Sequence, residues 1–323
     1  KVKFKNKIRE IMLKKYKGFV VLVLGVLLIT LCGCEYTKDR SNKWRTKFDI
    51  NLPNVAGAGS SPEAPNGEGW YSTLLTDFED NTLGDIWQPI NNCLRKEEYW
   101  CDKMVSQADG KVTISAREIA DHKCENCGDA SNLYTSGIAT FKFVDNKRVP
   151  TFEQAFGYFE ARVKLPNSGG MWSAFWLNSL GMGDVGNGGA DGAEIDIYES
   201  AFFKNKSMVG NCIHYDGYGK HHKAGEATHD VGYDLYEGYH TFSLKWTPNE
   251  YVFFVDGVAV WATNFGGVSK VAGYLLLTNE VRPNSKRGPY GQRLGDFTGG
   301  DFVIEYVNVY QNVDYLPHIV TRK

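Results

Sequence analysis

The chain has 323 residues, of which 42% are hydrophobic and 14% aromatic, and its formal net charge is −2. This length and composition are enough for one large folded domain with an N-terminal appendage. The 36 Lys and Arg do not outnumber the 38 Asp and Glu, which argues against nucleic acid as a partner because phosphate binding needs an excess of basic charge.

Residues 1–34 are predicted to be an export signal. A basic stretch, 1–17, precedes an apolar run, 19–31, which is shorter than the roughly 18 residues of a membrane-spanning helix. The sequence Leu31-Cys32-Gly33-Cys34 follows and resembles the bacterial lipobox, whose last Cys is lipidated, so Cys34 is the expected lipid anchor. Met12 is the expected true start. The alternative is that 19–31 is retained as a membrane anchor.

Export would change the charge of the protein. Removal of 1–34 takes away eight basic residues and one acidic residue, which brings the formal net charge to −9. Such a chain is compatible with a neutral polysaccharide and contacts the membrane only through its lipid. We expect a monomer that is exported and held at the cell surface.

Residues 35–69 are predicted to be a flexible linker, and 70–323 the folded domain. The linker contains Asn51-Leu52-Pro53-Asn54 and a Gly, Ser and Pro mixture over 57–67, which cannot bury enough apolar surface to offset its chain entropy.

From Trp70 onward the composition is that of an all-β protein. Short runs of β-branched and aromatic residues alternate with Gly, Asn, Asp and Pro, and no helical period of any length competes. Asp256-Gly257 indicates a tight hairpin between two runs, 251–255 and 258–261. We predict a two-sheet sandwich with strands over 112–116, 139–144, 156–164, 171–177, 241–246, 251–255, 274–278 and 302–310.

The exported part contains five cysteines. Export favours disulfides among Cys93, Cys101, Cys124 and Cys127. A zinc site of four thiolates, with Cys124-x-x-Cys127 as one half, is the alternative, and the pairing stays open. Cys212 is expected to be a buried free thiol.

The strand 192–200 carries three acids, Glu194, Asp196 and Glu199, separated by Ile195, Ile197 and Tyr198. Side chains of a regular strand alternate between faces, so Glu199 would point away from the other two acids. A β-bulge near Ile197 or Tyr198 would return Glu199 to their face. Two carboxylates about 5 Å apart are what a retaining glycosidase needs. The alternative is an exposed strand face with solvated acids.

At this strand the chain resembles glycoside hydrolase family 16, whose members carry Glu-x-Asp-x-(x)-Glu on a strand that lines a cleft. The longer spacing found here is typical of the branch with laminarinases, agarases and carrageenases. The resemblance covers roughly 75–311 and implies a β-jelly roll of the legume-lectin type, with a catalytic cleft on its concave face. It also implies Glu194 as nucleophile, Glu199 as acid/base and Asp196 as the residue that tunes the pair.

The resemblance extends to residues expected to bind substrate. In the family, the strand that matches 156–164 has a pair corresponding to Glu160 and Arg162 that lines the cleft; the alternative is a surface ion pair. Trp172 and Trp176 match an aromatic strand and share a face, where an indole can stack on a sugar. His214 matches a histidine that contacts sugar in relatives; the alternative is a packed structural histidine.

Two further segments bear on metal binding. Glu305 and Asn308 replace the Asp and Arg of the family's closing strand, which leaves a structural Ca²⁺ site open, while no cofactor is expected for the reaction. His214, His221, His222 and His229 lie around a turn-rich loop without a known ligand spacing, and we interpret this loop as a binding loop.

The resemblance implies an endo-acting β-glycanase that retains configuration, and the likeness of the Trp172 and Trp176 strand to that of laminarinases implies β-1,3- or mixed β-1,3/1,4-glucan as substrate. A galactan hydrolase of the same fold, similar to agarases and carrageenases, and a non-catalytic carbohydrate-binding lipoprotein are the alternatives. Sulfated substrates are disfavoured because the expected cleft offers mainly Arg162 as a cation.

Overall fold

A computed structural model describes residues 36–37, 45–46, 69–80, 83–90, 93–121, 124, 127–200, 205–282 and 295–322. The chain divides into two units, Lys1–Thr37 and Lys38–Lys323. The first contains β1 (Tyr36–Thr37), and the second contains every other described element. The expected signal and Cys34 lie outside the described residues, and no described helix is both long and apolar enough to cross a membrane.

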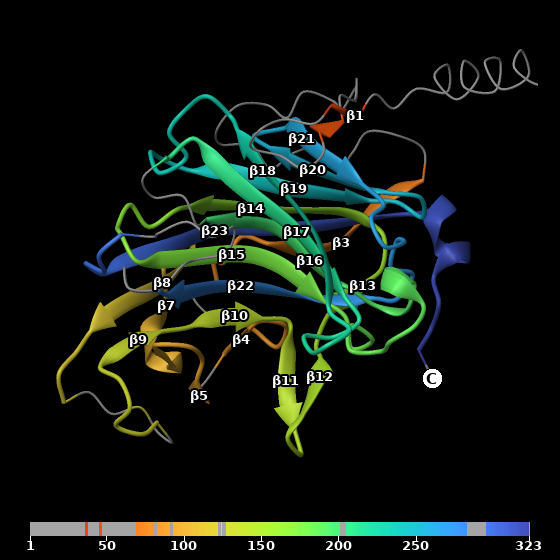
Figure 1. The fold of residues 1–323 in the computed structure, drawn as a ribbon. Coiled ribbons are helices and arrows are strands. Elements are labelled where there is room, and N and C mark those ends of the chain that lie inside the picture. Colours follow the sequence, from red (N-terminus) through yellow and green to blue (C-terminus); the bar gives the residue numbers. More distant parts are fainter. Residues whose placement is uncertain are drawn as a thin grey trace, which may run out of the picture. The chain divides into compact units, whose positions relative to one another are not determined.

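The second unit is built from two large β-sheets that pack face to face (Figure 1). The first, which we name the cleft sheet, has the order β18-β17-β16-β15-β22-β10-β4, with β13 also paired to β22. Its strands are β4 (Gln88–Pro89), β10 (Gly137–Ala139), β13 (Glu153–Gln154), β15 (Met171–Asn178), β16 (Glu194–Ser200), β17 (Met208–Tyr215), β18 (Lys223–Asp230) and β22 (Gly273–Val281).

The second sheet, which we name the outer sheet, has the order β21-β20-β19-β14-β23-β8-β9-β6-β5, with β3 paired to β23 and β7 to β8. Its strands are β3 (Trp70–Thr76), β5 (Cys93–Leu94), β6 (Tyr99–Trp100), β7 (Val105–Ala108), β8 (Lys111–Glu118), β9 (Leu133–Thr135), β14 (Gly157–Lys164), β19 (His240–Trp246), β20 (Tyr251–Val255), β21 (Val258–Thr263) and β23 (Gly300–Asn312).

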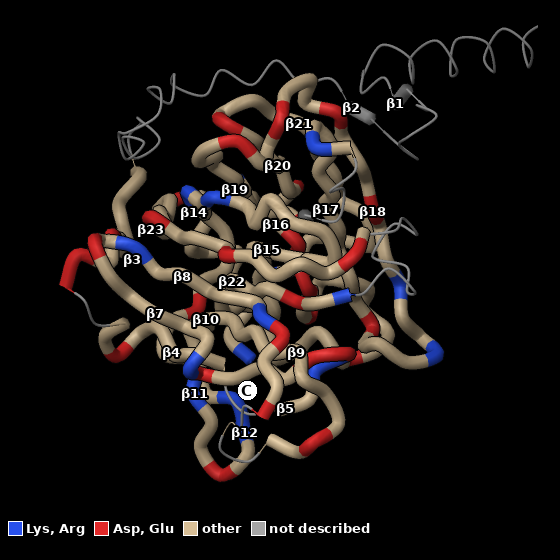
Figure 2. The backbone as a smooth tube through the Cα atoms, turned by 90° about the vertical axis from the view of Figure 1, so that its left-hand side faces the viewer, with Lys and Arg blue, Asp and Glu red and all other residues tan. Residues whose placement is uncertain are grey.

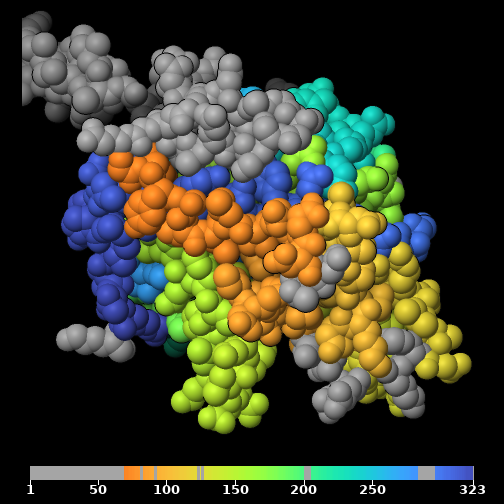
Figure 3. All heavy atoms as spheres, turned by 180° about the vertical axis from the view of Figure 1, so that it is seen from behind, coloured from red at the N-terminus to blue at the C-terminus, as the bar shows by residue number. Residues whose placement is uncertain are grey.

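The smaller elements complete the unit. A hairpin of β11 (Phe141–Val144) and β12 (Lys147–Pro150) projects from one side of it (Figures 1 and 3). The other elements among the described residues of this unit are β2 (Arg45–Thr46), η1 (Asp102–Met104), η2 (Gly188–Asp191) and η4 (Val313–His318).

A large apolar core between the two sheets holds them together. Phe175 and Leu277 of the cleft sheet and Phe159 and Phe242 of the outer sheet are fully buried in it. Burial of such side chains is the main stabilising contribution to a sandwich of this kind. The prediction of an all-β, two-sheet sandwich is confirmed, and seven of the eight runs expected from sequence each match one strand, with the run 156–164 beginning at Gly157. The run 139–144 was wrongly expected to be one strand, because it divides at Thr140 between β10 and β11, which belong to different sheets.

The expected hairpin at Asp256-Gly257 is also confirmed. Val255 pairs with Val258, and Asp256 and Gly257 have φ of 48° and 77°. Positive φ at both central residues defines the turn that matches the twist of two antiparallel strands.

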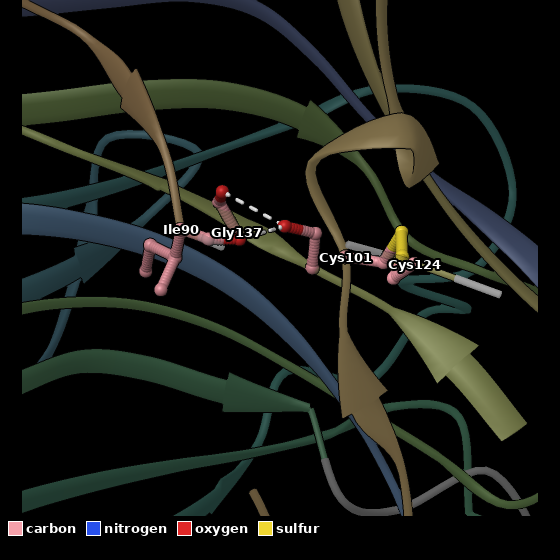
Figure 4. Close-up of a disulfide and its surroundings, with 5 residues drawn as sticks. Ile90, Cys101, Cys124 and Gly137 are labelled. Carbon is pink, nitrogen blue, oxygen red and sulfur yellow. Dashed lines mark hydrogen bonds between the residues drawn. A yellow bond between two sulfur atoms is a disulfide. The ribbon is translucent and has the colours of Figure 1, made fainter. Parts of the chain in front are cut away.

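One disulfide, Cys101–Cys124, closes a loop next to η1 (Figure 4). It bears out the expectation of a disulfide among the first four exported cysteines and excludes a zinc site formed by all four thiolates. Cys93 and Cys127 are free thiols, and Cys212 is the expected buried free thiol.

Candidate active site

Strand β16 contains the predicted β-bulge. Against β15, Trp176 pairs with Asp196 and the next residue back, Phe175, pairs with Tyr198, so that Ile197 is the extra residue. The register against β17 shifts in the same interval, between Asp196 and Glu199. The bulge therefore interrupts the alternation of β16 on both of its edges.

The bulge divides the side chains of β16 between core and cleft. Ile195, Ile197 and Tyr198 belong to the core, where the Tyr198 ring stacks on Phe242 with centroids 4.1 Å apart. The three acids instead line a cleft of about 610 Å³ on the opposite face of the sheet. Glu194, Asp196 and Glu199 are only 8%, 4% and 8% exposed, so the alternative of a strand face with solvated acids is wrong.

A side chain from β17 satisfies the backbone group that the bulge releases. Asn211 is buried and its Nδ2 donates a hydrogen bond of 2.6 Å to the Ile197 carbonyl. A carbonyl left unpaired at this depth would destabilise the fold. Asn211 thereby fixes the residue on which the orientation of Glu199 depends.

Glu194 lies in a network of donors. Its Oε2 accepts hydrogen bonds from Asn178 Nδ2 at 2.9 Å and from the Tyr218 hydroxyl. Burial raises the pKa of Glu194, and the nearby Glu199 charge adds to the rise. The His214 charge and the hydrogen bonds from Tyr218 and Asn178 oppose it, because they favour the ionised carboxylate.

Glu199 accepts a hydrogen bond of 3.0 Å at Oε1 from Trp172 Nε1. Trp172 lies on β15, where the neighbouring Ala174 is the cross-strand partner of Glu199. The indole thus approaches the acid diagonally across two adjacent strands, which is within reach of a large aromatic side chain.

His214 supplies positive charge beside the acids. Its Nε2 lies 3.3 Å from Asp196 Oδ2 and 3.7 Å from Glu194 Oε1. Burial alone would lower the pKa of His214, but the hydrogen bond and charge of Asp196, together with the charges of Glu194 and Glu199, outweigh burial and raise it to about 9. Burial and the Glu194 charge raise the pKa of Asp196 to about 6, while His214 opposes that rise.

A second histidine orients the first. His214 Nδ1 and His222 Nε2 are 2.9 Å apart, and the two rings stack. Burial and the His214 charge lower the pKa of His222. A neutral His222 can accept the Nδ1 proton of a charged His214, which leaves Nε2–H to donate toward Asp196.

The two tryptophans expected to bind substrate line the cleft. Lys96 Nζ lies 3.6 Å from the centre of the Trp172 ring, so one indole face is covered by a cation. Trp176 donates from Nε1 to Thr278 Oγ1 at 3.0 Å and packs against a small apolar cluster.

The expectation that Glu160 and Arg162 line the cleft was wrong. Both lie on β14 of the outer sheet. Glu160 is fully buried and accepts hydrogen bonds from Tyr158, Ser243 and Tyr306. Alternation correctly placed the pair on one face of a strand, but it does not say in which sheet that strand lies.

Arg162 forms an ion pair with Glu305 of β23. That pairing engages the carboxylate considered for Ca²⁺. The groups of described side chains close enough to share a metal are Cys101, Asp102 and Cys124, and Asp196, Cys212 and His214, and neither group includes Glu305.

Cations enter the cleft from segments other than the expected one. Arg95 and Lys96, in the turn between β5 and β6, both form ion pairs with the buried Glu280. Arg148 comes from the projecting hairpin, whose basic positions are visible in Figure 2, and donates to the Tyr274 hydroxyl at 3.1 Å. The argument against sulfated substrates, which relied on a cleft with Arg162 as its main cation, is therefore wrong.

Sequence reasoning missed Tyr218, Asn178 and Lys96. Tyr218 lies in the histidine-containing loop that was interpreted as a binding loop, but nothing in the sequence distinguishes it from Tyr215 or Tyr233. Asn178 had a signal, since it stands two residues after Trp176 and shares its face. Lys96 had none, because no local pattern connects its turn to β15.

The comparisons with known proteins agree with this geometry. The model of a family described as Glycosyl hydrolases family 16 matches residues 100–268, more than half of the chain. A relative, Endo-1,3-1,4-beta-glycanase ExsH of Rhizobium meliloti (strain 1021), is 26% identical over 180 residues, which are 55% of this chain. The match spans about a third of that relative's own length, 33%.

Two solved structures share the fold. The catalytic domain of an endo-1,3-beta-glucanase (laminarinase) from Thermotoga petrophila RKU-1 superposes with a TM-score of 0.57 at 22% identity, over 76% of this chain and 98% of that one. Porphyranase B from Zobellia galactanivorans superposes with a TM-score of 0.59 at 18% identity, over 81% and 99%.

Proposed function

The chain belongs to glycosyl hydrolases family 16, and from that premise we propose that it is an endo-acting β-glycanase that retains anomeric configuration. The observation that carries the proposal is the bulge at Ile197, which turns Glu194, Asp196 and Glu199 into one cleft. Two carboxylates on one face are the machinery of double displacement at a sugar.

Glu194 is the proposed nucleophile and Glu199 the proposed acid/base. A Glu194 oxygen attacks the anomeric carbon while Glu199 gives its proton to the departing glycosidic oxygen, which leaves a glycosyl ester on Glu194. Water then attacks the same carbon, Glu199 takes a proton from it, and the Glu194 carboxylate departs. Two inversions give net retention, and no cofactor takes part.

Asp196 acts mainly through His214 in this scheme. Its carboxylate holds the imidazolium that lies within 3.7 Å of Glu194 Oε1. A positive charge at that distance favours the ionised nucleophile. We therefore assign His214 to the electrostatics of the acids rather than to direct sugar binding.

The proposed substrate is β-1,3- or mixed β-1,3/1,4-glucan. The name of the Rhizobium relative supports this choice, and an open cleft lined by Trp172 and Trp176 suits a long neutral glycan whose apolar sugar faces need aromatic contacts. The endo mode of action is supported by the same name, which is that of an endo-acting glycanase.

A galactan hydrolase of the same fold is the second candidate. Arg148 lines the cleft, and among the described residues its contacts are the Tyr274 hydroxyl and the Phe141 ring rather than a carboxylate. A cation of this kind can bind a sulfate or carboxylate group. The fold is also that of a porphyranase.

Release of reducing ends from laminarin, lichenan, agarose and carrageenan tests the proposal. We expect the full chain to cleave laminarin or lichenan, and Glu194→Gln and Glu199→Gln to lose at least about a thousandfold in rate. Glu237→Gln, at an exposed site outside the cleft, is the matched control. Activity confined to agarose and carrageenan would favour the second candidate.

Retention of the protein in glycan-containing affinity gels, without any hydrolysis of the glycan, would instead favour a non-catalytic carbohydrate-binding lipoprotein.

We also propose that the protein is an exported monomer anchored through Cys34. Cys34→Ala should then move the protein from the membrane fraction to the soluble fraction.

The test for a structural Ca²⁺ is the addition of EDTA. A bound structural ion would be detected as a fall in Tm while the hydrolysis rate below Tm stays unchanged.

A further inference from the structure

The loop 216–222 between β17 and β18 reaches over the cleft to the proposed nucleophile. Its Tyr218 is 64% exposed, yet its hydroxyl contacts a Glu194 that is 8% exposed. The same hydroxyl accepts a hydrogen bond of 3.1 Å from Asn178 Nδ2. Its single proton is therefore free to be donated to Glu194.

The loop is held at several points, so this contact is not that of a loose side chain. Gly217 donates from its backbone to the Met182 carbonyl at 2.8 Å. At the other end, His222 is hydrogen-bonded to His214. The Tyr218 ring lies beside His222, with ring centroids 6.0 Å apart. Tyr218 is thereby fixed relative to both Glu194 and His214.

The two carboxylate oxygens of Glu194 have different surroundings. Oε2 accepts from both Asn178 and Tyr218. Oε1 has His214 Nε2 at 3.7 Å, beyond hydrogen-bonding distance. An oxygen that holds two donors is a poorer nucleophile than one that holds none, so the geometry separates an anchored oxygen from an attacking oxygen.

We propose that Tyr218 is a positioning residue of the active site, whose hydroxyl anchors Glu194 Oε2 and leaves Oε1 to attack the anomeric carbon. This inference rests on the proposed glycosidase function. The hydrogen bond also stabilises the negative charge of the carboxylate, which lowers the pKa of Glu194 against the effect of burial.

The contact matters in both chemical steps. When Oε1 bonds to the anomeric carbon and the glycosidic bond breaks, Glu199 gives its proton to the leaving oxygen and Glu194 loses its charge. Oε2 is then an ester carbonyl. When water attacks and Glu199 takes its proton, the electron pair of the breaking C–O bond returns to Glu194. A donor at Oε2 stabilises that departing carboxylate, so Tyr218 assists hydrolysis of the ester.

The test is the pH profile of kcat/KM for Tyr218→Phe in the full chain. A hydrogen bond to a charged group is strong enough to change a pKa by about one unit. We expect the acid limb to move upward by about one pH unit, because Glu194 without its donor is harder to ionise. We also expect kcat to fall about tenfold through slower ester hydrolysis.

The matched control is Tyr233→Phe. The Tyr233 hydroxyl donates to a carboxylate in the same way, to Asp256 Oδ2 at 2.8 Å, but it does not line the cleft. Its profile should coincide with that of the wild-type chain. An acid limb that stays in place in Tyr218→Phe, even with a raised KM, would reduce Tyr218 to a substrate contact and overturn the inference.

A second readout does not depend on turnover. Glutamate labelled with ¹³C at the carboxyl carbon allows Glu194 to be titrated by NMR, with its signal assigned from Glu194→Gln. The pKa of Glu194 should be higher in Tyr218→Phe than in the wild-type chain, and equal values would refute the hydrogen bond. An inactive wild-type chain with a raised pKa in the variant would reject the glycosidase function alone.

Discussion

His214 carries a charge that the fold stabilises, and its removal should change how stability depends on pH. Its pKa is raised from 6.5 to about 9 in the folded state, where the three acids of the cleft together outweigh burial. The folded state therefore binds the proton more tightly than the unfolded state. This contribution to the free energy of unfolding is fully present below pH 6.5 and is lost as pH rises through about 9.

Comparison of His214→Gln with the wild-type chain isolates this contribution. The wild-type free energy of unfolding should fall by up to about 3 kcal/mol more than that of the variant between the two pH values. Denaturant titrations at pH 6.5 and 9 measure both slopes. The same pH dependence in both chains would show that the acids of the cleft do not keep His214 protonated at neutral pH.

Residue-level prediction succeeded where chemistry and local spacing coincide. Glu194, Asp196 and Glu199 stand in one strand, so alternation and a single bulge were enough to bring them to one face. Tyr218 contacts Glu194, and Lys96 contacts Trp172 and Glu280, through long-range packing. Their neighbours in sequence say nothing about Glu194 or Trp172, so no reading of one sequence could have found them.

The side chain of Asn211 supports the bulge of β16, so a change at this one residue affects the whole strand. Asn211→Ala leaves the buried Ile197 carbonyl without its donor, and we expect a loss of about 1–3 kcal/mol in the free energy of unfolding. The activity should fall as well, since the Glu199 orientation depends on the bulge. Unfolding and hydrolysis are measured on the same samples.

Deletion of Ile197 provides the converse experiment. Without it, Tyr198 follows Asp196 and Glu199 follows Tyr198, so a regular strand places all three acids on the cleft face and Ile195 and Tyr198 in the core. The deletion variant should fold and retain activity. An insertion of Ala after Tyr198 should abolish activity, because it turns Glu199 toward the core.

The two changes also test each other. In the deletion variant, the carbonyl that Asn211 serves no longer exists, so a further Asn211→Ala change should cost much less than it does in the wild-type chain. Equal costs in both backgrounds would mean that Asn211 contributes through packing and not through the bulge.

Elements were predicted from their own residues, but their placement was not. The strand containing Glu160 and Arg162 was identified correctly, and so was the shared face of the pair. Sheet membership depends on pairing with β19 and β23, which lie more than about 70 residues away in the chain. Period-two alternation carries no information about such partners.

At the scale of the whole molecule, the Cys101–Cys124 disulfide closes a loop with a sequence separation of 23. It lies beside Trp100, which lines the cleft. A loop of this length is expected to contribute about 3 kcal/mol through the entropy of the unfolded chain. The double variant Cys101→Ser, Cys124→Ser should be less stable by that amount, and peptide mapping without reduction should recover the linked pair.

The fold class followed from composition and from turn residues because a sandwich repeats one simple pattern many times. The charge of the cleft could not be predicted from the sequence. The formal net charge of the whole chain is negative, but Arg95, Lys96 and Arg148 bring three cations to the cleft. Net charge is a sum over the molecule, whereas substrate selection depends on the side chains within reach of one ligand.

The central claim, that Glu194 is the nucleophile of a retaining mechanism, is tested most directly by azide rescue of Glu194→Ala. In this variant azide can enter the space of the missing carboxylate and attack an activated β-glycoside once. The account predicts a glycosyl azide of α configuration, observed by ¹H NMR of the anomeric proton. A β-glycosyl azide, or normal hydrolysis by the variant without azide, would contradict it.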